Sequence, residues 1–125
     1  MTPERARELL DAEEERLRTL RDQERARLSE SLEAATAELT SFDQHPADVA
    51  TETHEREVDQ SFVQAMEEGI LEVEAARRRV EEGTYGQCQL GGGDIPDERL
   101  EVVPTARYCV EHQTELEQRP HTPDT

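Results

Sequence analysis

The chain has 125 residues, of which 33% are hydrophobic and only 3% aromatic, so it has little material for a large globular core. Its 14 positive charges, all from arginine, stand against 31 acidic residues and leave a net charge of −17. Binding to nucleic-acid phosphates or to anionic membranes needs clustered positive charge, so this balance argues against both and favours a basic protein surface as partner.

A first helix is predicted from Pro3 to about Leu39. Thr2 is the candidate N-cap, and proline suits the first helical position that Pro3 occupies. Apolar residues recur along this segment at helical steps, and they are Leu10, Leu17, Leu20, Leu28, Leu32, Ala35, Leu39 and Phe42. A helix as polar as this one needs a partner helix to be stable.

A second helix is predicted from about Val49 to Val80, with Asp48 as its N-cap and Gly83 as its C-terminal glycine. Its apolar stripe consists of Val58, Phe62, Ala65 or Met66, Gly69 or Ile70, Val73, Ala76 and Val80. Two helices of similar length joined by a short turn predict an antiparallel coiled-coil hairpin over residues 1–84, with its tip near 41–50.

The composition changes after Gly83, where glycine and proline become frequent. Residues 85–117 are therefore predicted to form a small module of loops and turns, and residues 118–125 a disordered tail. The expected fold class is mostly α, a helical hairpin followed by this module. Since neither an apolar leader nor a membrane-spanning run is visible, a cytoplasmic location is expected.

The small module holds the residues with chemical potential. Cys109 and His112 have the C-x-x-H spacing of two zinc ligands, and Cys88 could supply a third. Gly91 stands where a fourth ligand is expected. On the residues alone this is a weak zinc signal, and the competing interpretation is two buried thiols and a surface histidine.

An enzyme is not expected. The glycines at 91–93 precede no helical pattern, so they do not form a phosphate-binding loop. Nothing in the sequence builds a pocket around either cysteine. A zinc-dependent hydrolase that uses the coordination position left open by Gly91 is the weaker alternative.

A longer pattern gives the module a family resemblance. It consists of Tyr85-Gly86-x-Cys88-x-x-Gly91-Gly92-x-x-Ile95-Pro96-x-x-Arg99-Leu100-x-x-x-Pro104-x-Ala106-x-x-Cys109-x-x-His112-Gln113. This run resembles the C-terminal zinc finger of the TraR/DksA family. The segment from Phe42 to Glu52, followed by Glu55-Arg56-Glu57-x-Asp59, is similar to the YteA branch of that family. That branch is known from spore-forming bacteria, which implies a role in sporulation.

The resemblance implies a transcription regulator that binds RNA polymerase. Family members insert the hairpin tip into the secondary channel of the polymerase, in some cases together with the nucleotide ppGpp. The tip residues that the family needs match Asp48 and Ala50, whereas a second acidic position holds His45 here. The alternative is a coiled-coil module that dimerises or binds another partner.

The resemblance also implies four cysteine ligands, of which this chain keeps Cys88 and Cys109, with His112 as a substitute and Gly91 as a loss. Three outcomes are open for zinc: a three-ligand site completed by water, a site completed by an acid such as Asp94, or no metal. Because structural zinc sites normally have four protein ligands, we expect no stable zinc. Packing must then hold the module, through Ile95, Leu100, Val102, Val103 and Tyr108.

Overall fold

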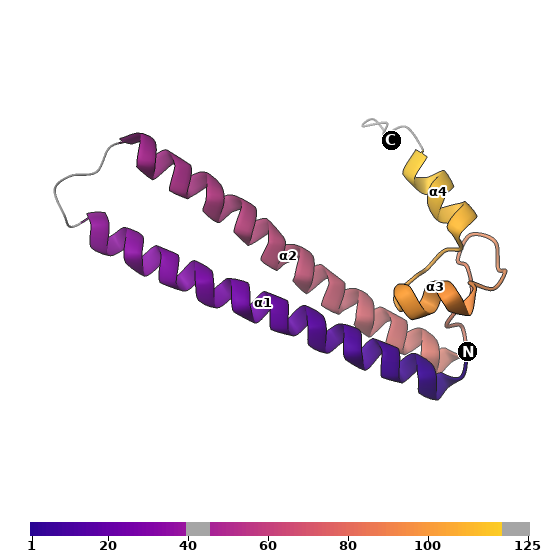
Figure 1. Ribbon diagram of the computed structural model, residues 1–125. Coiled ribbons are helices and arrows are strands. Elements are labelled where there is room, and N and C mark those ends of the chain that lie inside the picture. Colours follow the sequence, from indigo (N-terminus) through magenta and orange to yellow (C-terminus); the bar gives the residue numbers. More distant parts are fainter. Residues whose placement is uncertain (40–45, 119–125) are drawn as a thin grey trace. The chain divides into compact units, whose positions relative to one another are not determined.

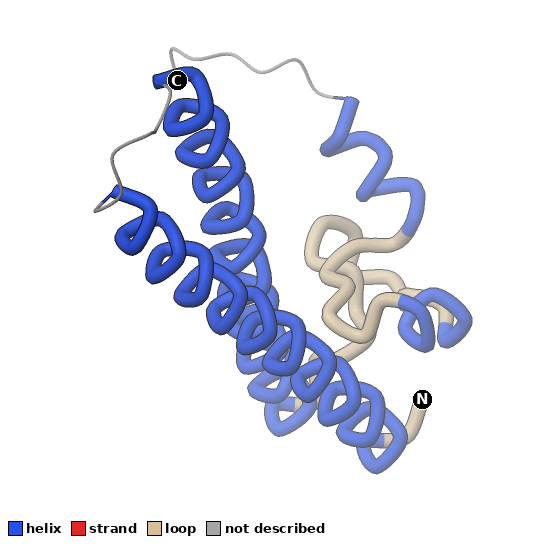
Figure 2. The backbone as a smooth tube through the Cα atoms, turned by 60° about the vertical axis from the view of Figure 1, so that its left-hand side comes forward, coloured by secondary structure: helices blue, strands red, loops and turns tan. Residues whose placement is uncertain are grey.

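A computed structural model describes residues 1–39 and 46–118, with side chains for residues 1–37 and 60–118. These residues form four helices (Figure 1), which are α1 (Pro3–Leu39), α2 (Pro46–Glu82), α3 (Asp97–Val102) and α4 (Val110–Gln118). The described backbone between them consists of turns and loops (Figure 2), with one isolated bridge between Gln87 and Asp94. The two short helices were not predicted from the sequence.

The ends of the long helices follow local chemistry. The backbone N–H of Arg5 donates to Thr2 Oγ1 at 3.2 Å, so Thr2 is the N-cap of α1 as predicted. Helix α2 ends at Glu82, and Gly83 then adopts a φ of 79°, the left-handed conformation that favours glycine. The start of α2 differs from the prediction, because the helix begins at Pro46, so Asp48 belongs to its first turn and does not precede it.

The chain divides into two compact units, and we call Glu14–Leu71 the hairpin unit. Within it α1 and α2 run antiparallel (Figure 1), and an ion pair joins Arg25 to Glu67. Gly69 allows a close approach of the helices, since a Cβ at this position would lie 3.0 Å from Leu17 Cδ1. A side chain at position 69 would force the Leu17 side chain to shift, so glycine favours close packing of the two helices here.

The finger unit comprises Met1–Glu13 and Glu72–Thr125. Its two long-helix segments pack through buried members of the predicted stripes, which are Leu10, Val73, Ala76 and Val80. Ala6 is buried with them, although the predicted stripe did not include it. An ion pair of 2.6 Å between Arg77 and Asp11 links the same segments. The short helix α3 is tied to α1, because Arg5 donates to both carboxylate oxygens of Glu101.

The finger itself has a separate small core. Its buried members are Cys88, Ile95, Leu100 and Ala106, with Tyr85, Tyr108 and Cys109 packed against them. Two of the predicted packing residues do not contribute, because Val102 is 80% exposed and Val103 is 37% exposed. Val102 is the last residue of α3 and Val103 is its C-cap, and the prediction of loops for this segment did not include such a helix end.

The predicted fold class is confirmed: the protein is mostly α, with a long antiparallel helical hairpin and a small C-terminal finger. Among the described helices, none is sufficiently long and apolar to cross a membrane.

Candidate metal site

The structure brings together the three predicted metal ligands of the finger. The donor atoms of Cys88, Cys109 and His112 all lie within 4.8 Å of one another. His112 Nδ1 lies 3.1 Å from the sulfur of Cys88 and 3.0 Å from that of Cys109. Cys88 is buried, whereas the other two are half-buried, so the cluster extends from the finger core to the surface.

Local backbone structure explains this convergence. Helix α4 begins at Val110, which places Cys109 directly before it and His112 in its first turn on the same side. The N–H of Gln113 donates to the Cys109 carbonyl at 2.9 Å and fixes this turn. The Cys88 loop lies alongside, because the N–H of Gln89 donates to the Arg107 carbonyl at 2.9 Å.

A tight turn shapes the loop around Cys88. The N–H of Cys88 donates to the Gly93 carbonyl at 2.7 Å, and the N–H of Gly92 donates to the Cys88 carbonyl at 2.9 Å. Gly92 has a φ of 66°, so the turn needs a residue that tolerates the left-handed region. This closed loop directs the Cys88 sulfur towards the start of α4.

The surroundings of Cys88 favour its thiolate form. Burial of the thiol raises its pKa, but hydrogen bonds from the backbone N–H groups of Cys109, Gly91 and Leu90 outweigh burial and lower the pKa of Cys88 to about 6. The thiolate is the form of cysteine that binds metals. The backbone donors of this loop therefore favour the form of the Cys88 sulfur that binds metals.

The three donors suit a zinc ion. Bonds of about 2.3 Å to sulfur and about 2.05 Å to nitrogen, at tetrahedral angles, place S and N donors about 3.6 Å apart. The observed sulfur–nitrogen distances of 3.0 and 3.1 Å would need to open by about 0.5 Å. Asp94 does not belong to the cluster, so the described residues supply three protein donors and not four.

The tip residues are the other predicted site. His45 lies outside the described residues. Asp48 and Ala50 belong to the first turns of α2, but their side chains also lie outside the described part of the chain. Their role stays a prediction.

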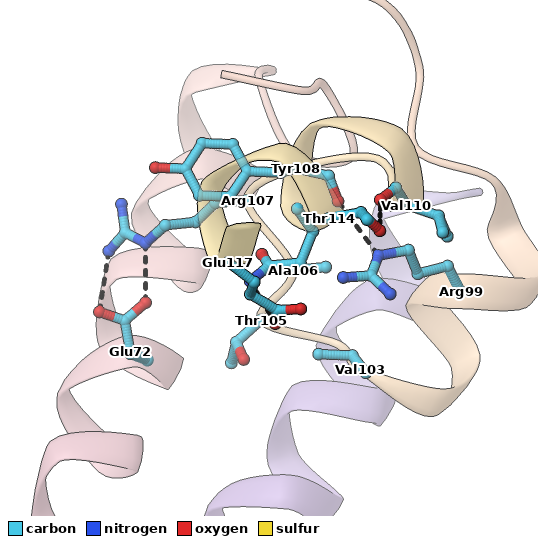
Figure 3. Close-up of a pocket in the computed structure, with 11 residues that line it drawn as sticks. Glu72, Arg99, Val103, Thr105, Ala106, Arg107, Tyr108, Val110, Thr114 and Glu117 are labelled. Atoms are coloured by element: carbon cyan, nitrogen blue, oxygen red, sulfur yellow. Dashed lines mark hydrogen bonds and ion pairs between the residues drawn. The ribbon is translucent and has the colours of Figure 1, made fainter. Parts of the chain in front are cut away.

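A second feature of the finger unit was not predicted from the sequence. An open pocket of about 460 Å³ lies between α2, α3 and α4 (Figure 3). On one side of it Arg107 makes two hydrogen bonds to Glu72, of 2.8 and 3.0 Å. On the other side Arg99 donates to the Tyr108 carbonyl at 3.1 Å. Glu72 and Arg107 are 35 residues apart, and no pattern in the sequence connects them.

The hydrogen bond from Arg107 is the main cause that lowers the pKa of Glu72. The charged side chains of Glu72, Arg107 and Arg99 thus have partners within the protein. Glu72 pairs with Arg107, and Arg99 donates to the carbonyl of Tyr108. The hydrogen bonds between Arg107 and Glu72 therefore join the finger to the C-terminal part of α2.

The protein therefore combines a long helical hairpin with a C-terminal finger that carries a Cys/His cluster. Residues 83–118 match the prokaryotic DksA/TraR C4-type zinc-finger family. This finger segment belongs to that family, and the resemblance predicted from the sequence is confirmed.

Two known proteins are similar to parts of this chain. The chain is 41% identical over 78 residues to the uncharacterized protein YteA of Bacillus subtilis, a match that covers 62% of this chain and 33% of YteA. It is 46% identical over 50 residues to the RNA polymerase-binding transcription factor DksA of Caulobacter vibrioides, covering 40% of this chain and 35% of that protein. The chain thus matches about a third of the length of these two relatives.

A solved structure has a similar fold over most of the chain. The transcription factor DksA2 from Pseudomonas aeruginosa aligns with a TM-score of 0.52 at 25% sequence identity, over 89% of this chain and 84% of that one. The hairpin and the finger therefore occur together in a related transcription factor.

Proposed function

We propose that this protein is a transcription regulator that binds RNA polymerase and inserts its hairpin tip into the secondary channel, towards the active site. The observation that carries the proposal is the combination in one chain of the helical hairpin with a DksA/TraR-type finger, as in DksA2. The name of the Caulobacter relative, a factor that binds RNA polymerase, supports the same kind of activity.

The acidic charge of the protein favours its binding in such a channel. The chain carries a net charge of −17, which suits the basic walls of a channel that receives nucleotides. Asp48 is the residue proposed to act at the catalytic magnesium, Ala50 to pack beside it, and His45 to replace a second acid. A contribution of ppGpp, action in the cytoplasm and a role in sporulation belong to the proposal as family expectations.

The finger is proposed to dock on the rim of the channel. An exposed apolar surface lies beside α3, formed by Pro96, Val102, Val103 and Val110. Val102 is 80% exposed and Val110 56% exposed, and large apolar side chains left in water favour burial against a partner. Zinc at the cysteine–histidine cluster would act structurally, by joining the Cys88 loop to the start of α4.

The test is a pull-down of bacterial RNA polymerase together with transcription in vitro. Asp48→Asn removes the tip charge at constant size and is expected to retain polymerase binding while losing the effect on initiation. The matched control is Glu30→Gln, an exposed acid of α1 in the hairpin unit, which should behave as wild type. Absence of polymerase binding by the wild-type protein would refute the proposal, as would an unchanged transcription effect in Asp48→Asn.

A second candidate function, a coiled-coil module that dimerises, is favoured by one observation. Three large apolar residues of the hairpin unit are exposed: Leu32 by 47%, Phe62 by 38% and Leu71 by 61%. Sedimentation equilibrium separates the two functions. A stable dimer that Phe62→Ser dissociates would favour self-association, whereas a monomer favours entry into the channel.

A further inference from the structure

The cluster in the finger offers one donor fewer than a structural zinc site. Such sites hold the ion with four protein ligands, whereas a site with three protein ligands keeps a position for water or another molecule. Here Cys88, Cys109 and His112 converge, and no fourth His, Cys, Asp or Glu joins them among the described residues. An ion bound at this cluster must complete its coordination from solution.

Gly91 is the residue that limits the cluster to three protein donors. A Cβ built at Gly91 would lie 2.6 Å from His112 Cε1 and 3.4 Å from both ring nitrogens. The ring cannot turn away and remain a ligand, because its Nδ1 faces the two sulfurs at 3.1 and 3.0 Å. Any side chain at position 91, including a cysteine ligand, therefore competes with His112 for the same space.

The requirement is specific to this glycine. Gly93 lies in the same loop, and a Cβ there would have nothing within 4 Å. Neither Gly91 nor Gly93 has a positive φ, so backbone conformation does not demand glycine at either position. What distinguishes Gly91 is the histidine ring against it.

The residues around the cluster are partly exposed to solvent. The loop at Gly91 and Gly92 is exposed, and Cys109 and His112 are half-buried, although Cys88 is not accessible. A donor from solution that suits an ion already bound to two sulfurs is a soft one, a thiolate. The histidine ring beside Gly91 limits such a ligand to a small size.

We propose that Cys88, Cys109 and His112 form a three-donor metal site whose fourth position exchanges water for a small thiol, and that Gly91 makes this possible by leaving room for His112. In the exchange the thiol loses its proton to the buffer, its sulfur bonds to the ion and water leaves, with no change in oxidation state. The site is then a ligand-responsive version of the finger, independent of whether the protein binds polymerase.

The experiment uses the full chain and cobalt(II) as a spectroscopic probe for zinc, with a phosphine as reductant. Addition of 2-mercaptoethanol to the cobalt-loaded wild type is expected to increase the thiolate-to-cobalt absorption and to saturate. The double variant Gly91→Cys/His112→Cys supplies four protein thiolates, so it should bind the metal more tightly and show no response to the added thiol.

Alanine variants test the contact between the two positions. Gly91→Ala should weaken metal affinity by about tenfold or more, as loss of a residue that positions a ligand does, whereas the control Gly93→Ala should leave the affinity unchanged. In the His112→Cys background, which removes the ring, Gly91→Ala should have no such effect. Circular dichroism of every variant verifies that α1 and α2 are intact.

Three results would overturn the proposal. One is a cobalt spectrum of the wild type that the thiol does not alter, because the fourth ligand then comes from the protein. Another is a wild-type chain that binds neither cobalt nor zinc where the four-cysteine variant binds both. The last is equal loss of affinity in Gly91→Ala and Gly93→Ala. All are measured without polymerase, so they are separate from failure of the proposed function.

Discussion

Truncation of Leu100 to alanine tests whether packing holds the finger together. Leu100 is 1% exposed and belongs to the small core with Cys88, Ile95 and Ala106. Burial of a leucine side chain contributes about 1.5–3 kcal/mol, and the cavity left by truncation adds to this loss. We therefore expect Leu100→Ala to lower the free energy of unfolding of the finger by about 3 kcal/mol.

The assay relies on the placement of the aromatic residues. The chain has no tryptophan, and both tyrosines, Tyr85 and Tyr108, pack against the finger core, so tyrosine fluorescence follows the finger. Circular dichroism follows chiefly α1 and α2. The free energy of unfolding of so small a unit falls by about 1 kcal/mol per molar of urea. A loss of about 3 kcal/mol should therefore lower the midpoint of the fluorescence transition by about 3 M or abolish that transition.

The control is Leu90→Ala, at a leucine of the same module that is 50% exposed, which should alter stability by less than about 0.5 kcal/mol. Fluorescence transitions that coincide for Leu100→Ala and wild type would refute the packing argument. Equal shifts in both variants would refute it too, since burial would then not decide the cost.

Two further predictions concern protons. The pKa of Glu72 is lowered by its hydrogen bonds with Arg107, so this pair stabilises the protein above the ordinary carboxyl pKa near 4.5 and the effect is lost as the pH falls below it. The pair is partly exposed and worth at most about 1 kcal/mol, so urea midpoints of wild type and Glu72→Gln should differ at neutral pH and converge in acid. Burial raises the pKa of Tyr85 to about 12, so its contribution to stability is complete below pH 10 and is lost as the pH rises towards 12. Absorbance titration of Tyr108→Phe, which leaves Tyr85 as the sole tyrosine, should give this value, and a pKa near 10 would contradict the burial argument.

The long helices could be predicted because their signals are local. Thr2 and Gly83 mark helix ends through backbone chemistry that involves only neighbouring residues, and both act as the sequence indicated. The predicted apolar stripes agree less well with the observed burial in the hairpin unit, where Leu32 and Phe62 are exposed. Helical periodicity predicts which residues share a face, but it does not predict how closely the partner helix covers each turn.

The finger shows the limit of sequence reasoning more clearly. The C-x-x-H spacing of Cys109 and His112 predicted their proximity, since both lie at the start of one short helix. That helix and α3 were missed, although Pro96 followed by Asp97 and Glu98 is a recognisable helix start. The contact between Gly91 and His112 had no signal at all, because it depends on how the Cys88 loop lies against α4.

This contact changes how the loss of a ligand should be understood. From the sequence, Gly91 was a missing donor and His112 a substitute for another, two separate departures from a four-cysteine finger. In the structure they are one change, because the larger ring fills the space that a side chain at 91 would need. A return to cysteine at position 91 alone should therefore not restore a four-ligand site.

Two separable interactions can hold the finger together: the packing of its core and the binding of a metal at its donor cluster. The core around Leu100 includes Cys88 and has Cys109 packed against it, but it does not include His112, and a 2.8 Å hydrogen bond from the Tyr85 hydroxyl to the Pro104 carbonyl adds to it. The donor cluster lies at the edge of this core and joins the Cys88 loop to α4. Loss of one donor should therefore reduce metal affinity far more than it reduces folding of the module. It follows that Leu100→Ala should lower the midpoint of the finger transition or abolish that transition in the metal-free protein, whereas Gly91→Ala should leave it in place there.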